Sequence, residues 1–260
     1  CMQSYVYQNL PNSKIIVEPT SAVKAERLAK INSRNLKIFP HNSILLITPT
    51  VHELECIHDT FATRELFDDY DYWFPLLDTL GADVEFRNKL SIIKSPILEE
   101  GLNKGFIQQS IKLLPYIPNI LLKLGEKGLL LIKLSSNVDD YKSIPTVSPY
   151  RPELIITSKG KTYGEFENRM GVVIEYFPIP EENRGITIEN VTGAGDSFLG
   201  YLAARMLVAN VALEEKTWLN SELTSVEQAW FLWERIYKAQ LACGKSLQTE
   251  AAVATDISLI

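Results

Sequence analysis

Alternation of strand-like and helix-like sequence near the start of the chain constrains the fold more than any other feature. The apolar run Ile15–Val17 predicts a short strand, and the stretch from Ser21 to Ile31 predicts a polar-faced helix. Ser43–Thr48 predicts a second, buried strand, which Pro49 ends, and Thr50 is a suitable N-cap for a short helix that bears Glu53. A strand, a helix and a strand in succession imply a parallel sheet with right-handed crossovers. We therefore expect an α/β fold.

Composition limits the classes of protein to which the chain can belong. With 260 residues, of which 46% are hydrophobic, it can bury a sizeable core, and this suits a single domain over residues 1–260. The net charge of −6 and the lack of a basic cluster offer no footprint for DNA or RNA. No apolar run approaches the ~18 residues of a membrane helix. Three cysteines without a C-x-x-C pair fit a reducing, cytoplasmic compartment.

The remaining elements follow from hydrophobic periodicity and turn residues. We expect a mostly helical insertion with a solvated acidic face and an aromatic core contact over Asp59–Ser95, and further helices over Leu102–Leu114 and Ser225–Ser246. Strands are expected over Ile120–Lys123, Leu129–Leu134, Leu154–Thr157 and Val172–Phe177, the last two as an antiparallel edge. The Ser-, Pro- and Asp-rich stretch Ser135–Pro152 predicts a surface loop.

The run Asn190–Gly200 joins a small-residue turn to the start of a helix. Such a turn leaves backbone N–H groups unpaired, and these donors, with the positive end of the helix dipole, suit a phosphate. Asp196 falls in the first turn of the helix, where its carboxylate can take a proton from a hydroxyl that attacks the phosphate. Helical spacing predicts burial of Phe198, Leu199, Leu202, Met206 and Leu207.

Other interpretations of this run are weaker or less specific. A dinucleotide-binding turn needs G-x-G-x-x-G, and the third glycine here is Gly200, one residue too late. A Walker A loop needs Gly-Lys, whereas Gly195 precedes Asp196. A glycine-rich loop that only caps a core helix remains an alternative. His52 and Glu53 do not make a zinc peptidase motif, because Cys56 stands where the second histidine belongs.

Three segments, in the same order as in the family, resemble the ribokinase-like (PfkB carbohydrate kinase) family. Thr192 with Gly193-Ala194-Gly195-Asp196 resembles the family signature. Lys123-Leu124-Gly125-Glu126-Lys127-Gly128 resembles its nucleotide-binding turn, and Thr48–Leu54 resembles its Asn-x-x-Glu motif. The resemblance implies a three-layer αβα fold with a mostly parallel central sheet. It also implies transfer of the γ-phosphate of ATP to a primary hydroxyl of a nucleoside or sugar.

The resemblance also implies roles for individual residues. Asp196 would be the catalytic base, and Gly193, Ala194 and Gly195 would form the anion hole. Glu53 would hold Mg²⁺ through water. The expected nucleotide-binding residues are Thr50, Lys123, Gly125, Glu126, Gly128 and Gln240. Asn190 and Thr192 would correspond to a monovalent cation site; because Asn190 replaces the usual Asp, we expect weak dependence on K⁺.

Within the family, the run Asn190–Ser197 looks most like the pseudouridine kinases, including the kinase halves of fungal bifunctional proteins, and Val17–Ser21 with Lys24-Ala25 points the same way. Pseudouridine is therefore the expected acceptor. The resemblance covers roughly the C-terminal two thirds of a family domain, so the N-terminal part, the lid and most acceptor contacts are expected to be missing and the isolated chain to be inactive.

Several alternatives stay open. Thr50 stands where the family has Asn, and this departure, with Asn190, leaves room for a catalytically impaired binding or regulatory module. A sugar or adenosine kinase of the same fold is a further alternative. A homo-oligomer and a fused or partner glycosidase domain are left undecided by the resemblance.

Overall fold

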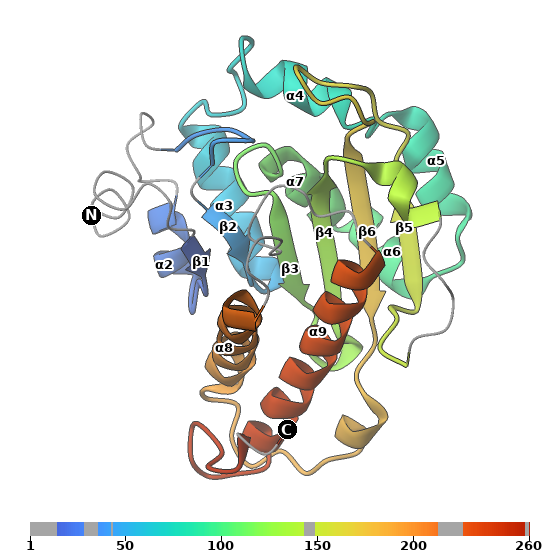
Figure 1. Ribbon diagram of the computed structural model, residues 1–260. Coiled ribbons are helices and arrows are strands. Elements are labelled where there is room, and N and C mark those ends of the chain that lie inside the picture. Colours follow the sequence, from blue (N-terminus) through green and yellow to red (C-terminus); the bar gives the residue numbers. More distant parts are fainter. Residues whose placement is uncertain (1–14, 29–35, 43, 143–148, 213–225, 258–259) are drawn as a thin grey trace.

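The computed structural model describes residues 15–28, 36–42, 44–142, 149–212, 226–257 and 260. At its centre lies a six-stranded sheet in the order β1-β2-β3-β4-β6-β5, with helices packed on both faces (Figure 1). The strands are β1 Ile15–Val17, β2 Ile44–Ile47, β3 Asn119–Lys123, β4 Leu129–Ser135, β5 Leu154–Thr157 and β6 Gly171–Phe177. The predicted α/β class is confirmed.

Strand direction divides the sheet into two halves. β1, β2 and β3 are neighbours and run parallel, whereas the pairs β3–β4, β4–β6 and β6–β5 are antiparallel. β3 turns directly into β4 through the short 3₁₀ helix η2, Gly125–Lys127, and a connection this short can join only antiparallel strands. β1, β2, β3 and β6 point the same way, so their carboxyl ends meet at one edge. The predicted antiparallel edge formed by β5 and β6 is confirmed.

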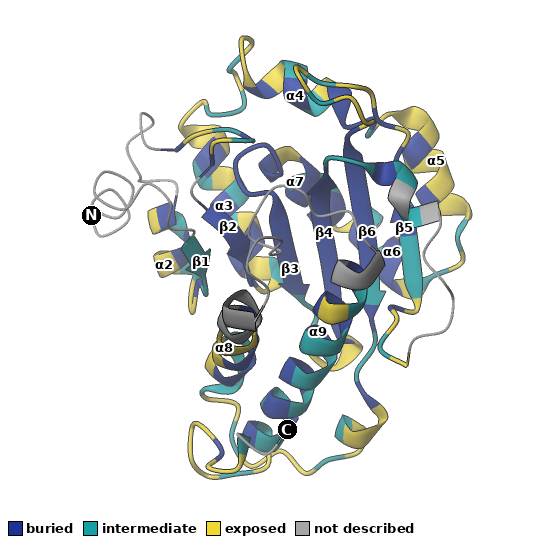
Figure 2. Ribbon diagram, viewed as in Figure 1, coloured by how far each residue is buried: buried dark blue, intermediate teal, exposed yellow. Residues whose placement is uncertain are grey.

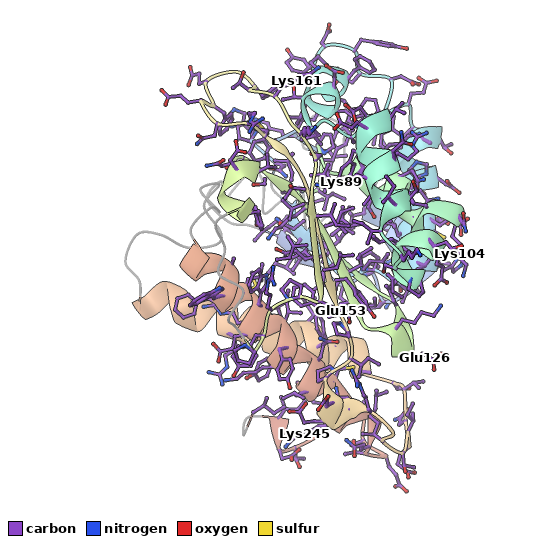
Figure 3. The ribbon with its side chains drawn as sticks, turned by 90° about the vertical axis from the view of Figure 1, so that its right-hand side faces the viewer. Lys89, Lys104, Glu126, Glu153, Lys161 and Lys245 are labelled. Atoms are coloured by element: carbon purple, nitrogen blue, oxygen red, sulfur yellow. The ribbon has the colours of Figure 1, made fainter. Side chains whose placement is uncertain are left out.

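Helices make the outer two of three layers, as expected from the resemblance. One face of the sheet carries α3 Val51–Thr63, α4 Trp73–Thr79, α5 Val84–Ile92, α6 Pro96–Asn103 and α7 Phe106–Leu113. The other face carries α8 Ala194–Ala212 and α9 Val226–Leu247. Figure 3 shows the sheet nearly edge-on between these two layers. The short helices α2 Ala22–Ala25 and η1 Glu26–Leu28 lie beside α3; η3 Val138–Lys142 and η4 Glu181–Asn183 are single turns.

The core consists of two apolar clusters, one on each face of the sheet. Successive side chains of a strand point to opposite faces, so Leu130 and Ile132 of β4 enter the cluster under α3 and α7, while Leu129 and Leu131 enter the cluster under α8 and α9. Figure 2 shows the central strands buried and the outer faces of the helices exposed. A sheet buried on both faces in this way positions the loops at its strand ends rigidly.

Two predicted helices differ from the structure. The helix predicted over Ser21–Ile31 is replaced by the short helices α2 and η1, and η1 ends at Leu28. Residues 29–31 of this prediction lie outside the described residues. The single helix predicted over Leu102–Leu114 is broken, because Gly105 adopts a left-handed conformation with φ of 81° between α6 and α7. The helical insertion over Asp59–Ser95 is confirmed by the end of α3 and by α4 and α5. Trp73 of α4 is its aromatic core contact.

The two helices on the other face bury only part of their apolar residues, including three of the five predicted for α8. Phe198, Leu202 and Met206 of α8 are buried, whereas Leu199 is only half-buried, and the side chain of Leu207 lies outside the described part. In α9, Trp233 and Ile236 are buried, while Trp230, Tyr237 and Leu241 are half-buried at the edge of the stripe. The predicted loop Ser135–Pro152 contains the turn η3, and residues 143–148 of it lie outside the description. None of the helices in the described ranges is both long and apolar enough to cross a membrane.

Candidate active site

Three polar side chains meet where β1, β2 and β3 end. Thr48 follows β2, and its Oγ1 donates a hydrogen bond to Oε2 of Glu18, which follows β1. Lys123, the last residue of β3, forms an ion pair with the other carboxylate oxygen of Glu18. The side chains of Lys123 and Glu18 are 18% and 11% exposed. Carboxyl ends of parallel strands are where open α/β sheets bind ligands, so this cluster marks the candidate site.

A second polar cluster continues the same edge into α3. Thr50 forms a parallel bridge with Lys123 and is the N-cap of α3, as predicted. The backbone N–H of Thr50 donates to Glu53 Oε2 at 2.8 Å, and the backbone N–H of Glu53 donates to Thr50 Oγ1 at 3.3 Å. This reciprocal capping box satisfies two helix-terminal donors. It holds the Glu53 carboxylate, in a residue only 7% exposed, beside the end of β3.

The glycine-rich turn ahead of α8 is held by the segment that follows α9. Gly193 has φ of 80°, and a Cβ atom there would collide with the backbone carbonyl of Ala252. Asn190 Oδ1 accepts a hydrogen bond from the N–H of Thr192 at 2.9 Å, and its Nδ2 donates to the carbonyl of Glu250 at 3.0 Å. The turn therefore requires glycine at residue 193, and both ends of the Asn190 amide are already engaged.

The first turn of α8 lies against the strand-end cluster. A Cβ atom on Gly195 would lie 3.2 Å from Lys123 Nζ and 3.3 Å from Glu18 Oε1. Within the described residues, the backbone N–H groups of Gly193, Gly195 and Asp196 have no hydrogen-bond partner. The Asp196 side chain is exposed. Free amides at a helix N-terminus, a lysine and a solvent-facing carboxylate thus gather in one place, and this combination can bind an anion.

Two pockets lie outside this cluster. One, of about 370 Å³, lies over α4, α5 and α7. The other, of about 470 Å³, lies between the segment that follows β6 and α9. Gln240 and Tyr237 of α9 line the second pocket, opposite Pro178 and Glu182. The Tyr237 hydroxyl donates to both oxygens of Glu182, at 2.8 and 2.9 Å. Burial, followed by this hydrogen bond, raises the pKa of Tyr237 to about 12, so the hydroxyl stays protonated. Gln240 itself is only 7% exposed.

Not all of the predicted site residues come together. The turn after β3 leads away from α8, since Lys127 Nζ binds Glu100 Oε2 of α6 at 2.7 Å. Figure 3 shows Glu126 on the same side of the sheet as Lys104, opposite Lys245 of α9. A Cβ atom on Gly128 would collide with the carbonyl of Phe177, so this glycine serves the packing of β4 against β6. Lys123 is therefore the residue of this motif that reaches the glycine-rich turn.

The sequence prediction missed Glu18 as a member of the site. Its signal was available, because Glu18 follows β1 just as Thr48 follows β2, and neighbouring parallel strands end at the same edge. The prediction also missed the link between α8 and α9, in which Ser197 Oγ and Ser246 Oγ lie 2.7 Å apart. This contact joins residues 49 positions apart, and no local pattern in the sequence indicates it.

Together, the three layers and the polar cluster at the strand ends define an α/β protein with a candidate anion site beside the first turn of α8. No family model matches the chain. The chain is 26% identical over 248 residues to a pseudouridine-metabolizing bifunctional protein of Schizosaccharomyces pombe, over 95% of this chain and 27% of that protein. The resemblance predicted from the motifs is confirmed by this match. The chain spans about a quarter of the length of this relative.

Solved structures that match the chain include two ribokinases. One, from Cryptococcus neoformans var. grubii in complex with ADP, is 14% identical, with a TM-score of 0.46 over 96% of this chain and 50% of that one. The other, from Thermotoga maritima, is 15% identical, with a TM-score of 0.40 over 98% of this chain and 50% of that one.

Proposed function

We propose that this chain carries the nucleotide-binding and phosphoryl-transfer part of a nucleoside or sugar kinase. The observation that carries the proposal is the exposed Asp196 carboxylate, one residue after Gly195 and its free amide, with Lys123 Nζ beside that glycine. In-line phosphoryl transfer needs these three parts: a base near the attacking hydroxyl, donors for the equatorial oxygens and a cation. We infer ATP as the phosphate donor.

Each of these residues has a separate task in the proposed reaction. The Asp196 carboxylate takes the proton of the acceptor hydroxyl as that oxygen attacks the γ-phosphorus; the bond from this phosphorus to the bridging oxygen breaks, and ADP leaves. The amides of Gly193, Gly195 and Asp196 donate to the oxygens on which negative charge develops. The Lys123 ammonium binds a neighbouring phosphate oxygen as a point charge. Ala194, the third residue predicted for the anion hole, offers no free donor, because its N–H already donates to the carbonyl of Val191 at 3.5 Å.

Glu53 fits a role beside a magnesium ion. Its Oε2 is occupied by the capping box, whereas its Oε1 accepts no hydrogen bond from the residues that the structure describes. A carboxylate oxygen that is fixed in place and free to accept suits a water of hydrated Mg²⁺, because this ion keeps several of its waters in proteins. When bound, the ion would neutralise charge on the phosphates. Asn190 and Thr192 are proposed at the monovalent cation position.

The pocket between η4 and α9 is the proposed place of the nucleotide base. Its proline and aromatic surfaces suit a flat ring, and Gln240 at its wall offers an amide. Gln240 lies seven residues before Leu247, which is about 10 Å along the helix, and Leu247 O accepts hydrogen bonds from Glu189 and Asn190 ahead of the glycine-rich turn. One helix therefore carries both the proposed base pocket and a contact to the phosphate end.

Pseudouridine is the proposed acceptor, supported by the match to the S. pombe protein whose name states that it metabolizes pseudouridine. That protein is called bifunctional and is almost four times as long as the match, which supports a fused second domain such as a glycosidase in the parent protein. A catalytically impaired binding module is the second candidate, favoured by the engaged amide of Asn190, which stands in place of the family's carboxylate.

The test is ATP consumption by the chain and by its full-length parent with pseudouridine, uridine, adenosine and ribose. We expect turnover by the parent with pseudouridine and a loss of at least a hundredfold in Asp196→Asn, the scale of a lost general base. Asp71→Asn is the matched control, since Asp71 is also an exposed acid but lies in the turn before α4. Full activity of a folded Asp196→Asn variant would refute the kinase mechanism. Nucleotide binding without turnover by the parent would favour the binding module.

A further inference from the structure

Glu18 occupies an unusual place for a carboxylate in a phosphate site. One of its oxygens accepts a hydrogen bond from Thr48 and the other pairs with Lys123, so two neighbouring strand ends fix its position. The pair lies directly against Gly195, where even a methyl group would approach Lys123 Nζ to 3.2 Å. The ammonium group nearest to the free amides of α8 is thus already neutralised in the absence of a ligand.

The charges around this pair are mostly negative. Glu53 lies across the bridge between Thr50 and Lys123, and Asp196 is in the first turn of α8. Cys243 of α9 adds no charge, because burial raises the pKa of its thiol and Lys123 offsets this only in part. Among the residues that the structure describes, the contacts above place three carboxylates and one ammonium group around the mouth of the site. A polyphosphate without a metal would meet repulsion here that a metal-complexed polyphosphate would not.

We propose that Glu18 is a specificity-determining residue that makes this site select a nucleotide polyphosphate complexed with a divalent cation over the free polyphosphate. The inference rests on the proposed function, because it presupposes that phosphates bind in front of Gly195. Glu18 offsets much of the positive charge that Lys123 offers to a phosphate, so Lys123 alone holds a metal-free polyphosphate weakly. A bound divalent cation supplies that charge with the ligand, so only the complexed nucleotide binds tightly.

The experiment measures the dissociation constant of ADP by calorimetry, once with Mg²⁺ and once with EDTA, and that of adenosine as a reference without phosphates. In Glu18→Gln, we expect metal-free ADP to bind about tenfold more tightly, a change typical of one charge near a phosphate. Mg²⁺–ADP should change less than about threefold and adenosine not at all. Glu85→Gln is the matched control, because Glu85 also pairs with a lysine, Lys159, but lies on α5. It should leave all three constants unchanged.

A second variant keeps the inference testable if Glu18→Gln does not fold. Lys123→Met removes the ammonium group instead. It should weaken the binding of metal-free ADP more than that of Mg²⁺–ADP, whereas Glu18→Gln should strengthen the binding of metal-free ADP. A wild-type chain that binds ADP with the same Mg²⁺ preference as Glu18→Gln would overturn this inference and leave the proposed function intact. Equal weakening of adenosine and both forms of ADP would also overturn it, since only a structural role does that. A wild-type chain that binds no ADP in either buffer would overturn the proposed function as well.

Discussion

The two sides of the candidate site are built differently. On the strand side, Glu18, Thr48, Thr50, Glu53 and Lys123 bind one another, and their polar groups are largely satisfied before any ligand arrives. On the helix side, the residues from Asn190 to Asp196 are half-buried or exposed, and the turn is held through contacts to residues 247–252. The amides of Gly193, Gly195 and Asp196 in this turn have no partner among the described residues.

This difference indicates that the strand side contributes mainly to stability and the helix side mainly to ligand binding. A network of hydrogen bonds within the protein contributes to the stability of the fold, so its loss should appear in unfolding experiments. Amides left open at a helix N-terminus contribute little to stability and are satisfied by a ligand, so changes in the turn should appear in binding. The predictions below test this division, beginning with the largest effect.

Gly193→Ala should damage binding most. The left-handed backbone at residue 193 and the carbonyl of Ala252 both exclude a side chain, so the turn must move and its amides with it. We expect the dissociation constant of ADP to rise about a hundredfold, or nearly 3 kcal/mol. Gly164→Ala is the control, because Gly164 has φ of 57° but nothing within 4 Å of its Cβ position. Equal losses of affinity in the two variants would contradict the special role of the turn.

Glu53→Ala should affect folding more than the turn variants do. It removes half of the capping box of α3 and leaves a buried gap, so the free energy of unfolding should fall by about 1–2 kcal/mol in urea titrations. Glu53→Gln can still accept from the N–H of Thr50 and should keep most of this stability while losing the carboxylate. If both variants unfold alike, the capping interaction does not hold this side of the site.

Asn190→Asp should reveal the monovalent cation position. We expect ADP affinity of the wild-type chain to change less than about twofold between KCl and choline chloride, since a neutral amide attracts a cation weakly. The variant gains a carboxylate, and its affinity should rise about fivefold with K⁺. A strong K⁺ requirement in the wild-type chain would contradict this prediction.

Tyr237→Phe should have the smallest effect. A hydrogen bond within Glu182 itself, followed by the bond from the Tyr237 hydroxyl, holds the pKa of Glu182 below its ordinary value of 4.5. The folded state therefore gains stability from this carboxylate above that value and loses it as the pH falls through the lowered pKa. The variant should lower the melting temperature by about 1 °C at pH 7. The difference should shrink as the pH is lowered below 4.5 and Glu182 takes up a proton; a constant difference would show that packing, and not the charge, is responsible.

Local patterns in the sequence predicted much of the fold. Thr50 was predicted as an N-cap from its position after Pro49, and its capping box with Glu53 follows the rule for residues three apart. The edge formed by β5 and β6 follows from two short β-rich runs. The break between α6 and α7 was not predicted, although Gly105 marks it, because a single glycine within an amphipathic pattern is also tolerated in a helix.

The candidate site was predictable where one segment supplies it. Gly193 to Asp196 form a helix N-terminus by themselves, and the sequence shows this directly. The turn after β3 was predicted as one nucleotide-binding segment, but its residues lie on different sides of the sheet. Lys123 reaches α8, whereas Glu126 lies on the side of α6. Spacing within a motif does not say to which face of a sheet each side chain turns.

By itself, the sequence determined the α/β class, the helix that begins at the glycine-rich turn and the residues that we propose to bind a phosphate. These depend on backbone preferences and on neighbours within a few residues. Only the tertiary structure decided that Glu18 and Lys123, 105 residues apart, form a pair against Gly195. That contact depends on the order of strands in the sheet and on the packing of α8 across it. Such long-range packing produces no periodic pattern in the amino-acid sequence.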